Sequence, residues 1–520
     1  MLDIILRNGT IIDGTGTGAF NGDVWIRGDK IVFVGKSEEE PPQAREIVDV
    51  TGYIVCPGFI DTHTHSDLAL LWDRQHAPAL MQGITTEILG QDGMSYAPLS
   101  KENLLMYSKY LAGSNGHAEL SFDWNTVAEF RSKFNRCGIN TAYLLPHSSL
   151  RLETVGMNDV LLDEEQLSKA CAMLGQGLEE GAKGFSTGLS YYPHAYSDTS
   201  ELIEFCKVAA KYGSVFAIHL RTVFRGEAFD PVCEAIEIAE KSGVKLHFSH
   251  YRTNIKTAGK TGFIMEKIDK AMSRGIDISL EIYPYSYGSS LGQMFLPRWT
   301  VEGGYYETLE RMKEPEVKKR LAMEIDNKWK GFNAYFSYLN KNTSYMGMTF
   351  SDVARERNQT LGEMLTDIIS EESLCVGFHD IPPEDDEVNR QIEQDALELL
   401  KRPNYMVGSD SILMGDNPHP RAFGTFPKFL RLSREYNYPL EQMINRMTKV
   451  PSDRFGLSGR GCLEQGNFAD IVVFDYHNVA DTAVPLRSRS APIGIEYVLV
   501  NGKIAVRDNH VTGILAGYGI

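Results

Sequence analysis

Residues 57 to 67 read PGFIDTHTHSD, and in this stretch two histidines separated by one residue follow an apolar run. In an extended strand, side chains two residues apart leave the same face, so His63 and His65 should project together while Thr62 and Thr64 point away. The whole chain contains only thirteen histidines. Two imidazoles on one face of a strand indicate a metal site.

The region that begins with this stretch alternates short apolar runs with segments of helical period, the pattern of parallel strands joined by crossover helices. The candidate strands are GFIDTHTH ending at His65, ITTEILGQD ending at Asp92, INTAYLLPH ending at His147, KGFSTGLSY ending at Tyr191, SVFAIHLR ending at Arg221, VKLHFSHYR ending at Arg252, IDISLEIYPY ending at Tyr285 and NYMVGSD ending at Asp410. Eight strand–helix units predict an α/β fold, a closed TIM (β/α)8 barrel. Polar residues end nearly every strand, at the face where such barrels carry active sites. A doubly wound open sheet is the alternative, but no GxGxxG follows the first strand.

The two ends of the chain read as short strands with turns between them. We expect residues 1–57 and 461–520 to pair into one small β-sandwich domain, which leaves residues 58–460 for the barrel. The segment from about 286 to 351 is long for a strand-to-helix connection and has a helical pattern of its own. Long inserts at this face commonly act as lids or substrate walls, and we expect that role here.

Charge and composition narrow the class of protein. A net charge of −17 without a local Lys/Arg run would repel phosphate backbones, so nucleic acid is not an expected partner. Seven scattered cysteines without a CxxC pair fit reduced thiols. The N-terminus lacks the features of a signal peptide, and no apolar run is long enough for a bilayer. We therefore expect a cytoplasmic protein with a small-molecule substrate and no membrane partner, of unassigned oligomeric state.

Five residues at strand ends have the chemistry of Zn²⁺ ligands, namely His63, His65, Asp92, His219 and His250. Each alone has an ordinary structural explanation, as a hydrogen-bonded core histidine or a turn aspartate. Together they are better explained by one metal site. A catalytic site of this kind keeps one coordination position for water, whose pKa the ion lowers toward neutrality.

Asp410 ends the last strand with a carboxylate. It could cap the segment SILMGD that follows, or it could take a proton from an activated water and pass it to a leaving nitrogen. The metal candidates nearby favour catalysis. His247 would face away from His250 on its strand and is interpreted as structural, whereas His147 fits either a site or a loop contact.

PGFIDTHTHSD resembles the HxH signature of the metal-dependent amidohydrolase superfamily. The segments GFSTGLSYYP, AIHLR, HFSHYR, EIYPYSYGSS, FLPRW, VGSD, HPRAFGTFPKFL and GNFADIVVFD resemble, in the same order, the N-acyl-D-amino-acid deacylases (D-aminoacylases) of that superfamily. The resemblance covers nearly the whole chain and implies the same barrel with a split β domain. It implies a zinc-dependent hydrolysis of N-acyl-D-amino acids to a carboxylate and a free D-amino acid. Its ligands would be His63, His65, His219 and His250, with Asp410 as the acid–base residue.

The segment GQDG departs from the branch, which usually has Cys in a GNCG-like segment there, so Asp92 takes the position of a thiolate ligand. A carboxylate is a harder ligand than a thiolate and leaves room for Mn²⁺, Fe²⁺ or Co²⁺ beside Zn²⁺. Its two oxygens could also bridge two ions. We therefore expect one or two divalent ions.

The substrate carboxylate calls for cationic or hydroxyl donors near the metal. The branch usually has Lys at the position of Arg252. Tyr192 and Tyr283 could instead be packing residues at the barrel mouth. Arg221 and Arg421 could bind a side-chain carboxylate of the substrate or pair with acidic loop residues. These candidates are Arg252, Tyr192, Tyr283, Ser289, Arg221 and Arg421.

The alternative enzyme is a cyclic-amide hydrolase of the dihydroorotase or hydantoinase type. Those members usually bridge two ions with a carboxylated lysine on the fourth strand. Here Lys183 lies at the beginning of that strand, at the wrong end to reach the metal, although Asp92 could replace it as the bridge. A non-catalytic scaffold would be expected to lose the ligands, yet they are all present.

Overall fold

Eight parallel strands form the centre of the molecule in this computed structural model, which describes residues 1–36, 42–116 and 119–520. Their order in the sheet is β16-β12-β11-β10-β9-β8-β7-β6. The strands are β6 (Phe59–Asp61), β7 (Ile84–Leu89), β8 (Asn140–Pro146), β9 (Gly184–Gly188), β10 (Val215–His219), β11 (Lys245–Phe248), β12 (Ile278–Ile282) and β16 (Tyr405–Val407). Each lies within one of the eight segments predicted from the sequence.

Backbone contacts between the first and last strands close this sheet into a barrel. The Thr62 N–H donates to the carbonyl of Val407 at 3.4 Å, and the His65 N–H donates to the carbonyl of Ser411 at 3.0 Å. Thr64 and Ser411 also form a parallel bridge. The predicted TIM barrel is therefore confirmed, and its closure lies immediately beside the two histidines of the first strand.

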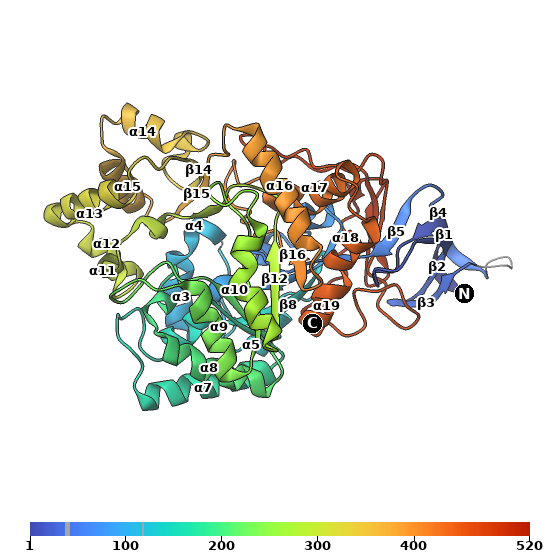
Figure 1. Cartoon of the computed structure of the whole chain (residues 1–520), viewed down its shortest axis with the longest axis horizontal. Coiled ribbons are helices and arrows are strands. Elements are labelled where there is room, and N and C mark those ends of the chain that lie inside the picture. The colour runs from blue at the N-terminus through green and yellow to red at the C-terminus, as the bar shows by residue number, and fades with distance from the viewer. Residues whose placement is uncertain (37–41, 117–118) are drawn as a thin grey trace.

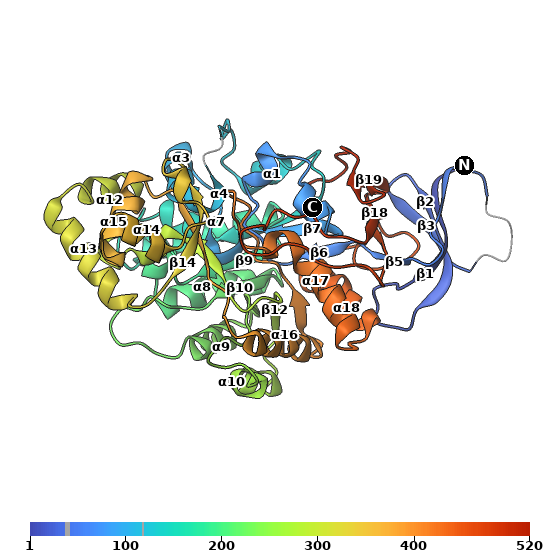
Figure 2. The same ribbon diagram turned by 90° about the horizontal axis from the view of Figure 1, so that it is seen from above.

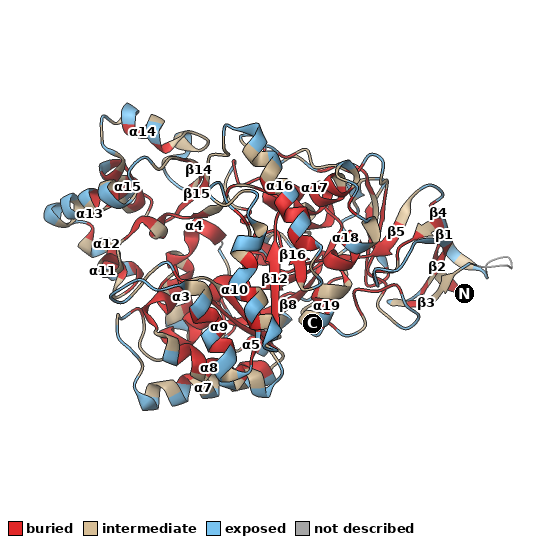
Figure 3. Cartoon of the chain, viewed as in Figure 1, coloured by how far each residue is buried: buried red, intermediate tan, exposed pale blue. Residues whose placement is uncertain are grey.

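Amphipathic helices connect the strands and cover the outside of the barrel (Figure 1). They include α7 (Glu164–Glu179), α8 (Thr199–Lys211), α9 (Pro231–Ser242), α10 (Thr261–Ser273), α16 (Asp386–Leu400), α17 (Arg421–Glu435) and α18 (Leu440–Met447). Helix α9 shows how local sequence sets their bounds. The Asp230 side chain accepts hydrogen bonds from the N–H groups of Val232 and Cys233, Pro231 occupies the first turn, and Gly243 ends the helix at φ +73°. Their buried faces pack on the strands, and their outer faces are exposed (Figure 3).

Strands from both ends of the chain join in one further sheet, with the order β20-β19-β18-β17-β5-β1-β2-β3 and β4 paired to β1. The N-terminal strands are β1 (Leu2–Ile11), β2 (Phe20–Arg27), β3 (Lys30–Gly35), β4 (Ala44–Asp49) and β5 (Ile54–Pro57), and the C-terminal strands are β17 (Ile471–Phe474), β18 (Ile495–Val500), β19 (Lys503–Arg507) and β20 (His510–Val511). Strand β5 pairs antiparallel with β17. The two termini are thus held in a shared sheet, as predicted; the domain boundaries stay a prediction.

The chain between β12 and β16 adds a small sheet in the order β13-β15-β14 and a group of helices. These elements are β13 (Ser289–Leu291), α11 (Arg298–Val301), α12 (Tyr305–Arg311), α13 (Pro315–Lys328), β14 (Ala334–Leu339), α14 (Phe350–Glu356), α15 (Leu361–Glu371) and β15 (Val376–Asp380). In Figures 1 and 2, helices α12 to α15 lie at the end of the molecule opposite to β1–β4. The expected inserted segment lies in this region, and β15 and α15 follow it in the chain.

The seven cysteines are free thiols. Within the described ranges, no helix combines the length and apolar character needed to cross a bilayer.

Candidate metal centre and active site

The carboxylate of Asp92 lies among four imidazoles at the C-terminal end of the barrel strands. Its oxygens lie 3.6 Å from Nε2 of His63, 3.7 Å from Nε2 of His65, 3.4 Å from Nδ1 of His219 and 3.8 Å from Nε2 of His250. Donor atoms around one tetrahedral ion, with bonds of about 2.0–2.1 Å, lie about 3.4 Å from one another. Most of these separations exceed a good hydrogen bond. They fit ligands that share an ion.

Asp410 lies beside the same histidines. Its Oδ1 is 3.3 Å from Nε2 of His65 and 3.6 Å from Nε2 of His63. Two overlapping sets of possible ligands result, one of His63, Asp92 and His250 and the other of His63, His65 and Asp410, each with ligand atoms within 4.8 Å of one another. His63 belongs to both sets.

Two atoms at this site lack the hydrogen bonds that buried polar atoms usually make. Nε2 of His63 and Oδ1 of Asp92 are buried, lie 3.6 Å apart, and have no hydrogen-bond partner within the described part of the chain. A divalent cation would satisfy both atoms, because neutral imidazole nitrogen and carboxylate oxygen are its ordinary ligands. The residues present therefore fit a divalent metal ion.

Three residues of the site adopt a backbone conformation that L-residues rarely use. Asp92 has φ +55°, His250 has φ +36° and Asp410 has φ +54°. Such conformations concentrate at functional sites, where the surrounding structure imposes them. Each residue lies just beyond a strand end, so strand alternation does not fix the direction of its side chain.

Glu281 is a residue of the site that the sequence analysis missed. It is buried on β12, and the Nδ1–H of His63 donates to its Oε1. Its Oε2 accepts from Thr62 Oγ1 at 2.7 Å and from His247 Nε2 at 3.1 Å. Burial alone would raise the pKa of Glu281, but His63 and His247 outweigh it and lower the pKa to about 2. One signal was available, a lone acidic residue inside the apolar strand ISLEI.

The two other histidines of the predicted barrel strands, His247 and His147, have structural partners. His247 hydrogen-bonds Ser279 Oγ at 2.7 Å through Nδ1, as its structural interpretation implies. His147 is buried between Thr187 Oγ1 at 2.9 Å and Glu201 Oε1 at 2.8 Å. Both ring nitrogens of His147 are thereby used, which leaves none for a metal.

Arg421 is the cationic partner of Asp410, with Nη1 2.8 Å from Oδ2. Burial alone would raise the pKa of Asp410, but Arg421 and His63 outweigh it and hold the pKa below its ordinary value. The carboxylate is therefore ionised at neutral pH. No helix begins between Asp410 and α17, so Asp410 does not cap the segment that follows it.

These groups open into a pocket of about 250 Å³. Its lining includes His65, Asp92, Tyr191, His219, His250, Tyr283, Ser289, Asp380, Asp410 and Arg421. Arg252 contacts this lining, because its Nη2 donates to the hydroxyl of Tyr283 at 3.0 Å and its guanidinium lies 4.6 Å from the centre of that ring. The guanidinium of Arg421 lies 4.7 Å from the centre of the same ring. Positive charge is thus concentrated beside the ligand cluster.

A family model described as the amidohydrolase family matches residues 46–211 and 381–506. The chain belongs to the amidohydrolase family. It is 31% identical to a D-aminoacylase of Alcaligenes xylosoxydans xylosoxydans, over 99% of this chain and 96% of that one. This confirms the family and the branch predicted from the sequence.

Two solved structures are similar to this amidohydrolase over essentially its whole length. A D-aminoacylase described for its binuclear metal center, with one-metal activation and second-metal attenuation, has a TM-score of 0.79 and 29% identity, covering 99% of both chains. An N-acyl-D-glutamate deacylase from Bordetella bronchiseptica, complexed with zinc and a phosphonate mimic of the tetrahedral intermediate, has a TM-score of 0.81 and 28% identity, covering 100% of this chain and 99% of the other.

Three predicted substrate-binding residues of this amidohydrolase lie outside the lining of the metal pocket: Arg252, which contacts it through Tyr283, and Arg221 and Tyr192, which do not. Arg221 is buried and donates from Nε to Glu234 Oε2 at 2.9 Å, which is the acidic pairing that the sequence left open. Tyr192 lines a different cavity, and it is Tyr191 whose ring lies 5.2 Å from that of His219. Strand β9 ends before both tyrosines, so its alternation could not indicate which one faces the metal ligands.

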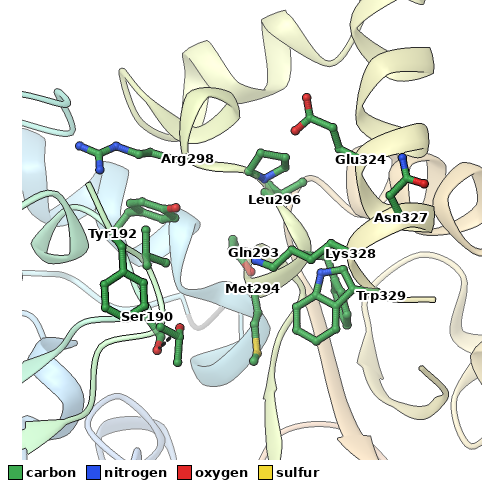
Figure 4. Close-up of a pocket in the computed structure, with 15 residues that line it drawn as sticks. Ser190, Tyr192, Gln293, Met294, Leu296, Arg298, Glu324, Asn327, Lys328 and Trp329 are labelled. Atoms are coloured by element: carbon green, nitrogen blue, oxygen red, sulfur yellow. Dashed lines mark hydrogen bonds between the residues drawn. The ribbon is translucent and has the colours of Figure 1, made fainter. Parts of the chain in front are cut away.

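The cavity lined by Tyr192 is a larger chamber of about 740 Å³ that adjoins the metal pocket. Ser190, Tyr192 and residues 222–224 line it from the barrel, and residues 293–298, Glu324 and residues 327–329 line it from the chain between β12 and β16 (Figure 4). Met294 and Trp329 line both cavities. We call this cavity the outer chamber.

Proposed function

We propose that this amidohydrolase cleaves the amide bond of N-acyl-D-amino acids by metal-dependent hydrolysis, releasing a carboxylate and a free D-amino acid. One observation carries the proposal: four imidazoles face the Asp92 carboxylate, with Asp410 beside them, in a chain of the D-aminoacylase branch. Metal-assisted amide hydrolysis needs this combination of ligands and a nearby proton acceptor.

The metal ligands in this proposal are His63, His65, Asp92, His219 and His250. Zn²⁺ suits this nitrogen and oxygen donor set, and Mn²⁺, Fe²⁺ or Co²⁺ suit it as well. A bound ion supplies polarisation of the amide oxygen and lowers the pKa of water. The position of Asp92 among all four imidazoles supports a site for one or two ions.

Asp410 acts as the acid–base residue. Arg421 helps to keep its carboxylate ionised, the form that accepts a proton from the attacking water. After attack on the amide carbon, the protonated Asp410 transfers that proton to the departing nitrogen, so that the amine leaves neutral. The side chain thus returns to its ionised state within one turnover.

The α-carboxylate of the substrate binds on the Tyr283 side of the pocket. Arg421 is already engaged with Asp410, whereas Arg252 is held by the hydroxyl of Tyr283, so Arg252 and Tyr283 are the better placed pair of donors. Ser289 lines the same pocket. A guanidinium can hold a carboxylate in two parallel hydrogen bonds, which would fix the substrate before attack.

The competing activity, opening of a cyclic amide, lacks its usual bridging lysine here. Lys183 precedes β9 at the N-terminal end of the strand, where its N–H donates to the carbonyl of Tyr143 at 2.7 Å. Its side chain therefore starts at the end of the barrel opposite to the ligand cluster.

A panel of N-acetyl-D-amino acids, their L-enantiomers, hydantoin and dihydrouracil tests the proposal on protein loaded with Zn²⁺, Mn²⁺ or Co²⁺. We expect release of free D-amino acids. Ring opening without hydrolysis of any N-acetyl-D-amino acid would refute the assignment. A titration of activity against metal content distinguishes a site that needs one ion from a site that needs two. Full activity with one equivalent of metal would count against a requirement for two ions.

A further inference from the structure

The outer chamber is much larger than the metal pocket, and a substrate with only an acetyl group would not need this additional space. The two volumes are about 740 and about 250 Å³. Met294 and Trp329 border both, so a substrate held at the metal pocket can continue past these two side chains. In Figure 4 Met294 and Trp329 are drawn near Gln293 and Lys328. A substrate that extends beyond these two side chains would enter the chamber.

Two polar groups in the lining of this chamber have no hydrogen-bond partner among the residues that the structure describes. Gln293 is only 4% exposed, and its Nε2 donates to the carbonyl of Tyr110. This bond fixes the orientation of the amide, because a carbonyl can accept only from the nitrogen, and it leaves Oε1 as an unpaired acceptor. The indole Nε1–H of Trp329 is an unpaired donor in the same lining. Buried polar groups without partners are rare, and leaving them so costs stability.

Two charged groups on the same walls, Glu324 and Arg298, are paired within the protein. Glu324 accepts from Trp299 Nε1 at 3.1 Å and from Arg320 Nε at 2.8 Å, and Arg298 is bound to Asp159. Among the described residues that line the chamber, Gln293 Oε1 and Trp329 Nε1 are the buried side-chain atoms without a partner. A ligand that offers one N–H and one carbonyl would satisfy both.

A secondary amide is the group that offers this pair. We propose that the outer chamber binds the acyl part of the substrate and that this acyl part contains a second amide, as in an N-acylated dipeptide with a C-terminal D-residue. The amide N–H donates to Gln293 Oε1, and its carbonyl accepts from Trp329 Nε1. The inference rests on the proposed function, because it concerns the same reaction at the same site.

The reaction consumes one water for each peptide cleaved. Water oxygen bonds to the carbonyl carbon that precedes the D-residue, and the bond from that carbon to the D-residue nitrogen breaks. One water proton goes to this nitrogen. The products are an N-acyl amino acid with a new carboxylate and the free D-amino acid, and the second amide stays intact.

Three substrates that share one D-residue test this inference: the N-acetyl, the N-pentanoyl and the N-(acetylglycyl) compounds. The pentanoyl chain has the length of acetylglycyl and lacks the second amide. We expect kcat/KM for the acetylglycyl compound to exceed that for the pentanoyl compound by about tenfold, because two hydrogen bonds to otherwise unpaired groups are gained. The D-residue is the one that the enzyme releases fastest from its N-acetyl derivative.

Two variants locate the effect. Trp329→Phe removes the N–H and keeps a ring, and Gln293→Met removes the acceptor at similar volume; each should lower the acetylglycyl-to-pentanoyl ratio about three- to tenfold. Trp25→Phe is the matched control, since Trp25 also has an unpaired Nε1–H but lies on β2 of the terminal sheet. Its ratio should equal that of the wild type.

The outcomes separate this inference from the proposed function. If the wild type hydrolyses N-acetyl-D-amino acids but its acetylglycyl-to-pentanoyl ratio of kcat/KM is near one, the inference of a second amide is wrong and the deacylase assignment is unaffected. A high ratio that both variants preserve also overturns the inference, because the contacts would lie elsewhere. Failure to hydrolyse all three compounds with any D-residue overturns the proposed function, and the inference with it.

Discussion

The carboxylate of Glu281 accepts a hydrogen bond from Nδ1 of His63 in the buried interior of the barrel. Because the pKa of Glu281 is about 2, this carboxylate is ionised and can only accept, so the proton of His63 must be on Nδ1. Nε2 points toward Asp92 and Asp410, and in the neutral imidazole it carries the lone pair that a metal ion would bind. Glu281 thereby determines which nitrogen of His63 is available to a metal ion.

Replacing Glu281 by Gln should weaken metal binding about 10- to 100-fold, the usual effect of losing a group that orients a ligand histidine. The amide can offer an N–H to Nδ1 and so place the imidazole proton on Nε2, where it would repel a cation. Competition between the protein and a chelator of known Zn²⁺ affinity measures the change. An affinity equal to that of the wild type would mean that Glu281 does not orient His63.

Glu201→Gln is the matched control for that variant. Glu201 is also a buried carboxylate bonded to a histidine, His147, and it pairs with Arg151. Breaking this buried ion pair should cost about 3–5 kcal/mol of the free energy of unfolding. Metal affinity should stay unchanged in the folded protein, because His147 uses both ring nitrogens for other contacts. Denaturant titration and the same chelator competition distinguish the two effects.

Replacing Asp92 by Asn should lower metal content at least about tenfold after dialysis against a fixed concentration of free ion, because a neutral amide is a poorer ligand than a carboxylate. Asn keeps the size of the side chain and tolerates the φ of +55° at this position. Elemental analysis beside circular dichroism would show a folded protein with less metal. Undiminished metal content would remove Asp92 from the ligand set.

Replacing Asp410 by Asn should lower kcat about 10²- to 10⁴-fold, the usual contribution of a general acid–base residue. The amide cannot take the proton of the attacking water. Metal content, measured on the same preparation, distinguishes this role from that of a ligand, because Oδ1 of Asp410 lies only 3.3 Å from Nε2 of His65. Near-normal turnover with full metal occupancy would exclude the proposed proton transfer.

The barrel and much of its ligand cluster were predictable from the sequence for a topological reason. Parallel strands of a closed barrel direct their C-terminal ends to the same rim, so His65, His219 and His250 meet although they are far apart in the chain. His63 and His65 also lie on one side as expected, with both facing Oδ1 of Asp410, although β6 ends at Asp61 before either of them.

Other contacts made by residues just beyond the strand ends were not predictable. Asp410 and Arg421 pair across a loop whose path local sequence does not determine. Tyr191 and Tyr192 both follow the end of β9, and the chain after this strand places only the ring of Tyr191 beside that of His219. Glu281 lies within a strand, but its importance depends on a histidine 218 positions away.

The last prediction concerns the carboxylate end of the substrate. Replacing Arg252 by Met keeps the aliphatic stem beside Tyr283 and removes the charge, so KM for an N-acetyl-D-amino acid should rise with little change in kcat. A hydrogen bond to a charged group contributes about 1.5–3 kcal/mol, which corresponds to a loss of about 10- to 100-fold in kcat/KM. Arg221→Lys is the control, because Arg221 pairs with Glu234 outside the pocket lining and should affect stability rather than KM. If instead kcat falls and KM stays constant, Arg252 acts on the transition state and the carboxylate must bind elsewhere, with Arg421 as the next guanidinium to replace.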